Sequence, residues 1–152
     1  MKHVNKILVI ANSTWSLYNF RFNLMEAISK NHQVKILSNK DEFLSIFKNK
    51  NYLFEEFSFN RKSKNILINF LNIVILFFKI KNYKPKIIIS FGLKPNLYSV
   101  IIGKILKIKI ITTFTGLGTL YLNKNFTQKM IIILFKFFLS KKQKVIFHNN
   151  QD

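Results

Sequence analysis

The sequence predicts an α/β fold, a Rossmann-like parallel sheet with helices on both faces. Short apolar runs rich in β-branched residues recur along the 152 residues, and a longer stretch with apolar residues at helical spacing follows nearly every one. Polar or glycine-containing clusters separate the two kinds of segment. Because a strand that returns parallel to its neighbour needs a right-handed crossover, this alternation indicates a sheet covered on both sides.

The first part of the chain is predicted to form a β-α-β unit. A buried strand, whose apolar run Ile7–Ala11 is too short for a signal peptide, ends at the polar cluster Asn12-Ser13-Thr14. A helix with apolar residues at helical spacing follows from Leu17 and ends at Asn31-His32. Residues 33–37 then resume a strand pattern.

The middle of the chain contains an unusually apolar helix. After a polar break, we expect a short helix over Glu42–Lys48 and a strand over Tyr52–Phe59. Residues 65–79 are then almost entirely apolar, and their polar members share one narrow helical face: Asn65, Asn69, Asn72 and Lys79. This stretch is shorter than the roughly 20 residues of a bilayer span. We therefore expect it to pack in the core or at an interface rather than to cross a membrane.

Two strands in the second half end in candidate site loops. Pro85 ends the apolar helix, and the strand Ile87–Ile89 stops at the loop 90–96. The strand Ile108–Phe114 stops at Thr115-Gly116-Leu117-Gly118. Ligands of open α/β sheets bind at this carboxyl edge, so both loops are candidates for a site. The remaining elements are a helix from about Pro95 to Leu106, a helix over Phe126–Leu139 and a strand over Lys144–His148.

The composition favours one cytoplasmic domain with a core of its own. The chain has no cysteine, which excludes disulfides and thiolate metal sites, and nothing in it indicates an oxidising compartment. Its 25 Lys and Arg residues against 6 Asp and Glu give a formal charge of +19. Such a charge attracts phosphates of nucleic acid or anionic lipid, although much of it can equally be solvated surface.

Several chemistries are excluded by the residues. The first strand-to-helix turn has no glycine for a dinucleotide, the chain has no P-loop, and its three histidines are scattered. Glu55 and Glu56 are adjacent and so point to opposite faces of a strand, which disfavours a glycoside hydrolase. No Asp-x-Asp triplet is present to hold a metal against a diphosphate. Any transfer chemistry is therefore expected to be metal-independent, with no cofactor.

Four local motifs make the chain resemble the amino-terminal half of a family 4 glycosyltransferase of the GT-B class. Three of them follow the first, fourth and fifth predicted strands, and the fourth lies at the end of the sequence. The more specific two are a Lys-Pro-Asn-x-Tyr helix start and a Thr-Gly-Leu-Gly turn, typical of bacterial members that build surface polysaccharides or lipid-linked glycans. The motifs are Asn12-Ser13-Thr14-Trp15 with Asn19-Phe20-Arg21, Lys94-Pro95-Asn96-Leu97-Tyr98, Thr115-Gly116-Leu117-Gly118, and Val145-Ile146-Phe147-His148-Asn149.

The resemblance implies transfer of a sugar from a nucleotide donor to a glycan or lipid-linked acceptor, with retention at the sugar carbon. It places the enzyme at the cytoplasmic face of the cell membrane, in peripheral contact with anionic lipid. In the family the donor nucleotide and the paired glutamates of the active centre belong mainly to a second domain. We expect residues 1–152 to be a single domain that lacks this donor-binding partner and transfers no sugar alone.

The candidate substrate-binding residues lie at the carboxyl edge of the sheet. Gly116 and Gly118 let the backbone approach a ligand, and Thr115 can donate to hydroxyl or phosphate oxygens. Arg21 offers a planar fork to phosphate, and Lys94 can neutralise an anionic group. Each assignment has an alternative in which the residue has only a structural role. These alternatives are a tight turn for residues 115–118, a surface ion pair for Arg21, a solvated lysine for Lys94 and a strand-ending cap for Asn149. The complete set is Asn12, Ser13, Arg21, Lys94, Asn96, Thr115, Gly116, Gly118 and Asn149; no general base is assigned.

Three functional hypotheses follow from these observations. The first is the acceptor-binding half of a glycosyltransferase, either a fragment of a longer protein or one subunit of a split enzyme. The second is a non-catalytic module that binds membrane surfaces through residues 65–84 and 126–142. The third is nonspecific nucleic-acid binding by charge, for which the sequence offers no interleaved aromatic and basic motif.

Overall fold

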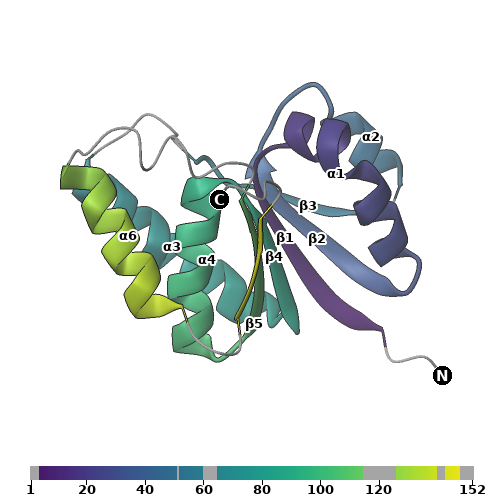
Figure 1. The fold of residues 1–152 in the computed structure, drawn as a ribbon. Helices are drawn as coiled ribbons and strands as arrows, with labels where there is room; N and C mark the ends of the chain where they lie inside the picture. The colour runs from purple at the N-terminus through teal and green to yellow at the C-terminus, as the bar shows by residue number, and fades with distance from the viewer. Residues whose placement is uncertain (1–3, 51, 60–64, 115–125, 140–142, 148–152) are drawn as a thin grey trace.

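The computed structural model describes residues 4–50, 52–59, 65–114, 126–139 and 143–147. They form a six-stranded, wholly parallel sheet with the order β3-β2-β1-β4-β5-β6. Helices α1 and α2 cover one face, and α3, α4 and α6 cover the other (Figure 1). The Rossmann-like α/β class predicted from the sequence is confirmed. The strands are β1 (Asn5–Ser13), β2 (His32–Asn39), β3 (Leu53–Glu56), β4 (Ile87–Phe91), β5 (Lys109–Phe114) and β6 (Gln143–Phe147). The helices are α1 (Thr14–Ser29), α2 (Leu44–Asn49), α3 (Ile66–Tyr83), α4 (Leu93–Leu106) and α6 (Phe126–Phe138).

The two faces of the sheet have separate hydrophobic cores. Along β1, Ile7, Val9 and Ala11 pack with α1 and α2, while Leu8 and Ile10 pack with α3 and α4. Because successive side chains of a strand point to opposite faces, a strand buried on both sides reads as a continuous apolar run. This pattern is why the first strand could be recognised from its sequence.

The loop predicted over residues 90–96 is much shorter in the structure. Strand β4 continues through Ser90 and Phe91, and α4 begins at Leu93, so Gly92 alone joins them. The φ of Gly92 is +102°, a left-handed value that residues with a side chain rarely adopt. Lys94 and Asn96 therefore lie in the first turn of a helix rather than in a loop.

Helix α3 is not the core helix that the sequence allowed. Only Leu76 and Ile80 are buried, and the remaining apolar side chains are mostly exposed, with Leu67 at 73% and Phe70 at 61%. Within the described residues, α3 is the one helix long and apolar enough to cross a membrane by length and composition. Of the two kinds of packing expected from the sequence, this exposure fits an interface and does not fit the core.

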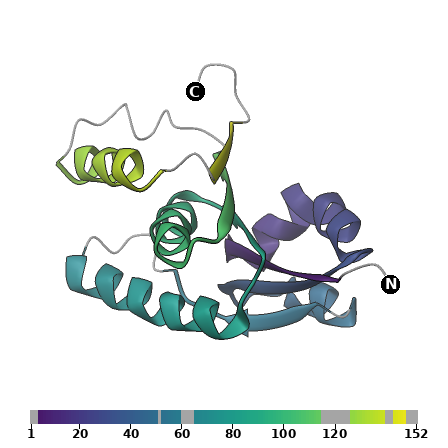
Figure 2. The same ribbon diagram turned by 90° about the horizontal axis from the view of Figure 1, so that it is seen from below.

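Helix α4 is the central helix of its layer, with every residue from Pro95 to Gly103 buried. It lies between α3 and α6 (Figure 2). Lys104 donates from Nζ to the carbonyl of Phe137 at 2.5 Å and lies over the Phe137 ring, which joins α4 to the last turn of α6. Gly103 allows the last turn of α4 to approach β5, because a Cβ at this position would overlap the side chain of Ile110.

The close contact at Gly103 leads to a prediction about stability. Alanine is favoured over glycine in a helix by about 1 kcal/mol, but Gly103→Ala would force a methyl group into Ile110. Overpacking of this kind costs about 1–3 kcal/mol, so we expect a net loss of stability in urea unfolding. The double variant Gly103→Ala/Ile110→Ala should lose less than the sum of the two single changes. Strict additivity would show that the two residues do not compete for space.

Candidate functional site

The candidate site lies where the strand order reverses. Strands β1 and β4 are neighbours in space, although β2, β3 and three helices separate them in sequence. Helix α1 leaves β1 on one face, and α4 leaves β4 on the other (Figure 1). In open α/β sheets the crevice at this switch point is the usual place for a ligand.

Asn12 and Gly92 lie against each other at this switch point. A Cβ at Gly92 would overlap the side-chain amide of Asn12, so the glycine is required for space as well as for its positive φ. The Oδ1 atom of Asn12 is buried and has no hydrogen-bond partner in the described part of the protein. Asn12 therefore stays a candidate for binding a ligand that can donate a hydrogen bond.

Ser13 has a structural role at the start of α1. It is the N-cap residue, and its Oγ accepts from the backbone N–H of Ser16. Asp41, in the loop after β2, completes the cap: its carboxylate accepts from the Trp15 N–H at 2.8 Å and from the Thr14 hydroxyl. Because these contacts occupy the positive end of α1, its backbone offers little to a phosphate. Asp41 was not found from the sequence, since it lies 26 residues from its partner.

Arg21 lies beside the end of β4. Its guanidinium carbon is 5.2 Å from the centre of the Phe91 ring, and Nη1 donates to the Phe20 carbonyl at 3.0 Å. Partial burial lowers the pKa of Arg21, because desolvation disfavours the charged form. A hollow of about 360 Å³ alongside α1 is lined by residues 18–24, Arg21 among them. The structure thus places Asn12, in β1, and Arg21, beside Phe91 of β4, at the switch point.

Asn96 joins α4 to the sheet. It is fully buried, and its Nδ2 donates to the carbonyl of Thr113 in β5 at 2.9 Å. Its backbone N–H also donates to the Gly92 carbonyl, which closes the first turn of α4. The Lys-Pro-Asn motif therefore contains a residue that fixes the helix on β5.

Lys94 points away from α1, toward α3 on the other face of the sheet. Its Nζ donates to Oδ1 of Asn69 at 3.0 Å, and the Tyr98 hydroxyl donates to the same oxygen at 2.8 Å. Burial lowers the pKa of Lys94 and raises that of Tyr98, because it disfavours both charged forms. Asn69 belongs to the polar stripe recognised in the sequence, but its partners could not be foreseen from that stripe.

Two further polar residues of α3 also have structural partners. Asn65 caps the helix, with Oδ1 accepting from the backbone N–H groups of Leu67 and Ile68. Lys79 pairs with Glu55 of β3, which also pairs with Lys35. Burial acts to raise the pKa of Glu55, but the hydrogen bonds and charges of these two lysines together hold it below its usual value. The narrow polar face of α3 is thus the face that docks it on the domain.

Four of the candidate residues, Thr115, Gly116, Gly118 and Asn149, lie outside the described residues, so their roles stay predictions. Over the ranges that the structure describes, no group of three His, Cys, Asp or Glu side chains is placed to hold a metal ion. What the described edge offers is the Arg21 guanidinium, the buried amide oxygens of Asn12 and Asn96, which have no partner in the described part of the protein, and the close-approach turn at Gly92. These groups suit hydrogen bonding to hydroxyl and phosphate oxygens.

One of the comparisons with known proteins shows a family. The sequence pattern of a family described as glycosyl transferase 4-like matches residues 6–149. A comparison with curated proteins found no match.

Solved structures with the same fold include transferases and an epimerase. A glycosyltransferase from Rickettsia africae has 16% identity and a TM-score of 0.63, over 95% of this chain and 42% of that one. MurG of Acinetobacter baumannii has 11% identity and a TM-score of 0.57, over 86% and 39%. A protein of Listeria monocytogenes described as a UDP-N-acetylglucosamine 2-epimerase has 12% identity and a TM-score of 0.60, over 90% and 37%. At these identities the likeness shows the fold, and the chain spans less than half of each structure.

The cap at α1 leads to a second prediction. Loss of a helix N-cap costs about 0.5–2 kcal/mol, so Asp41→Ala should lower the free energy of unfolding by that amount in urea. Glu42→Ala is the matched control, because it removes the same charge from an exposed neighbouring residue. Equal losses from the two variants would show that charge, rather than the cap, is responsible.

Proposed function

We propose that this chain, which belongs to the glycosyl transferase 4-like family, is the acceptor-binding half of a nucleotide-sugar-dependent glycosyltransferase. The family predicted from the sequence is thereby confirmed. The observation that carries the proposal is the family match over residues 6–149, together with the position of Asn12, Gly92 and Arg21 at the switch point of the sheet. The fold alone would not separate a transferase from an epimerase.

The groups at the switch point suit an acceptor better than a nucleotide donor. A dinucleotide or nucleoside diphosphate is usually held by the free backbone N–H groups of the first helix, which are capped here by Ser13 and Asp41. The side chains of Arg21 and Asn12 at this edge are of the kinds that match hydroxyl and single phosphate groups. We assign the acceptor to this edge and the donor to a second domain or subunit.

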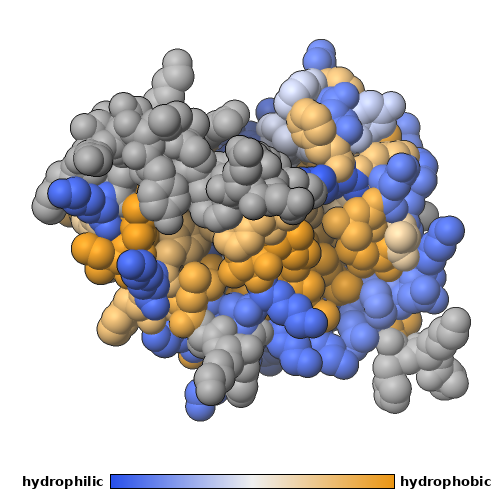
Figure 3. All heavy atoms as spheres, in the orientation of Figure 1, coloured by the Kyte–Doolittle hydropathy of each residue, from blue (hydrophilic) through white to orange (hydrophobic). Residues whose placement is uncertain are grey.

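The complete enzyme is proposed to work at the cytoplasmic face of the membrane. Helix α3 exposes a row of apolar side chains: Ile66, Leu67, Phe70, Leu71, Ile75 and Phe78. An exposed apolar patch flanked by basic residues is typical of a membrane-contacting surface. Hydrophobic side chains also gather over α4 and α6, next to hydrophilic ones along the lower edge (Figure 3). This exposure also motivates the second candidate function, a membrane-binding module without catalysis.

The assignment of the donor to a second domain or subunit leads to a prediction about activity. We expect no release of nucleoside diphosphate from any nucleotide sugar by the purified chain, because water exclusion and donor alignment require a closed cleft. Turnover by the chain alone would contradict this. If coding sequence for a second α/β domain follows Asp152, addition of that domain should restore transfer. A module without catalysis would stay inactive in both assays.

The exposed face of α3 leads to a prediction about membrane binding. Leu67→Ser/Leu71→Ser should weaken flotation with anionic liposomes about 100-fold, since two partly inserted leucines contribute roughly 3 kcal/mol. Leu24→Ser is the control, because Leu24 is exposed on α1 across the sheet. Flotation that is unaffected by the α3 changes, or equally reduced by the control, would remove α3 from the membrane contact.

A further inference from the structure

Polar side chains lie in the hydrophobic layer between α4 and the sheet. Two of them, Ser90 of β4 and Thr112 of β5, are paired in register on neighbouring strands. Each comes two residues after an isoleucine of the core on the α4 side, Ile88 and Ile110. Because alternate residues of a strand share a face, both hydroxyl groups are directed toward α4. The exposed fraction is 0% for Ser90 and 1% for Thr112, so both are buried.

Helix α4 contributes two more polar side chains to the same layer. Asn96 donates to the Thr113 carbonyl, and Gly103 lies against Ile110. These two contacts mark the side of the helix that faces the sheet. Ser99 lies between Asn96 and Gly103 at helical spacing, and therefore on the same side. Both Asn96 and Ser99 are fully buried. The residues that meet under α4 form a polar cluster: Ser90, Asn96, Ser99 and Thr112.

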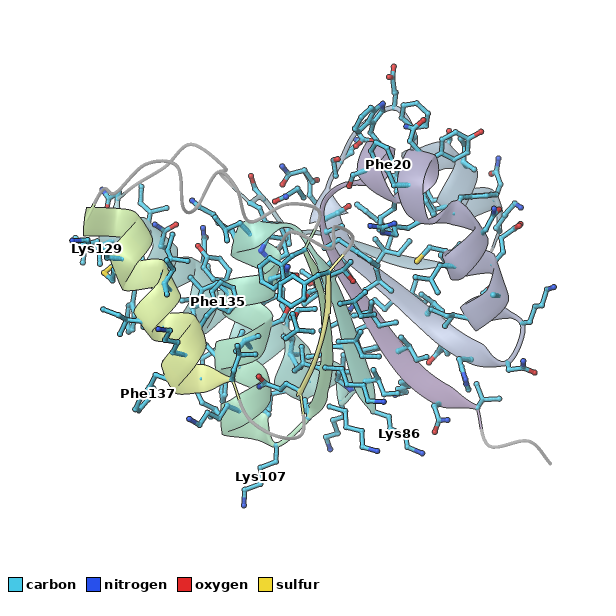
Figure 4. The ribbon with its side chains drawn as sticks, viewed as in Figure 1. Phe20, Lys86, Lys107, Lys129, Phe135 and Phe137 are labelled. Atoms are coloured by element: carbon cyan, nitrogen blue, oxygen red, sulfur yellow. The ribbon has the colours of Figure 1, made fainter. Side chains whose placement is uncertain are left out.

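Apolar side chains enclose this polar cluster along β5. Ile110 precedes Thr112 on the face toward α4, and Phe114 follows it on that face. The Phe114 ring packs edge-on against Phe135, with 5.4 Å between the ring centres. Figure 4 shows Phe135 pointing from α6 toward the sheet. The cluster therefore lies inside the core and away from bulk solvent.

Each residue of the polar cluster has one atom without a hydrogen bond. The three hydroxyl oxygens and Oδ1 of Asn96 are buried and have no partner among the described residues. For Ser99 this includes the carbonyl one turn earlier in the helix, to which a helical serine often bonds. A buried polar group that is left unpaired loses its hydration without compensation, which is why such groups are rare in folded proteins. Four of them in one layer therefore indicate a bound ligand.

The chemistry of the polar cluster defines that ligand. A hydroxyl group can donate or accept, whereas Oδ1 of Asn96 only accepts, so the ligand has to donate at least one hydrogen bond. None of the four side chains is charged, and residues 57–151 contain no Asp or Glu that could neutralise a cation. A metal ion is therefore a poor fit. Water both donates and accepts, and it is the smallest molecule that does so.

We propose that the polar cluster binds internal water, which bridges α4 to the central strands. A buried water molecule makes about three hydrogen bonds, so roughly two molecules satisfy all four groups. This bridge adds to the bond between Asn96 and the Thr113 carbonyl and holds the first two turns of α4 on the sheet. The inference goes beyond the proposed function and does not depend on it, because it concerns how the helix that begins after Gly92 is held.

The first test removes one hydroxyl group without changing the shape of the side chain. Thr112→Val loses a hydrogen bond to the bridging water, so its unfolding equilibrium constant in urea titrations should rise about 5-fold. Ser99→Ala should act in the same direction, although less strongly, because alanine favours the helix. The double variant should lose less stability than the sum of the two, since both hydroxyls bind the same water.

Thr113→Val is the matched control for this coupling. Thr113 is the next residue of β5 and lies on the opposite face of the sheet, so its effect should add to that of Ser99→Ala. A cluster without water would give the opposite sign for Thr112→Val, because removal of an unpaired buried hydroxyl stabilises a protein. An unchanged or smaller unfolding constant for Thr112→Val, or strict additivity with Ser99→Ala, would overturn the proposal. Ser90→Ala provides the same comparison if Thr112→Val fails to fold by circular dichroism.

A crystal structure of the 152-residue chain provides the direct test. We expect a water oxygen within about 3.2 Å of at least two of the four groups. The same water should be lost or displaced in Thr112→Val. Direct hydrogen bonds among the four side chains, with no water between them, would explain coupling in urea equally well and would rule out the bridge.

Discussion

The seating of α4 on the middle of the sheet is the constraint on which both proposed sites depend. Gly92 turns the chain within one residue, Asn96 ties the first helical turn to the Thr113 carbonyl, and Gly103 lets the last turn approach Ile110. With both ends fixed, one end of α4 lies at the switch point beside Asn12, and its inner face forms one wall of the polar cluster. A shift of α4 would therefore disturb both regions together.

The two faces of the domain use their helix starts differently. At α1, Ser13 and Asp41 satisfy backbone N–H groups, so the acceptor contacts proposed at that side come from the side chains of Asn12 and Arg21. At α4, no side chain among the described residues caps the helix at Gly92. The partial positive charge of that helix start therefore lies at the switch point, where Gly92 contacts Asn12.

The sequence was sufficient for the order and type of the elements, because β-branched runs and helical spacing are local patterns. It could not place the end of β4, since Phe91 continues the strand only by pairing with Ala11 and Thr113 on its neighbours. The sequence also could not predict the direction in which the Lys94 side chain points. Lys94 was expected among the ligand-binding residues of one edge, but its contact with Asn69 depends on how α3 crosses α4. Contacts between residues far apart in the chain decided both of these differences between expectation and structure.

The polar stripe of α3 explains why an apolar helix lies on the outside of the domain. A helix that is apolar nearly all round has no preferred face by hydrophobicity, so its few polar contacts fix its rotation. The Asn69 contacts with Lys94 and Tyr98, and the Lys79 pair with Glu55, turn that stripe toward the domain. The same rotation leaves Leu67, Phe70 and Leu71 on the outer side. Polar docking and apolar exposure are thus two results of one arrangement, and contact with lipid would bury the exposed side without disturbing the docked one.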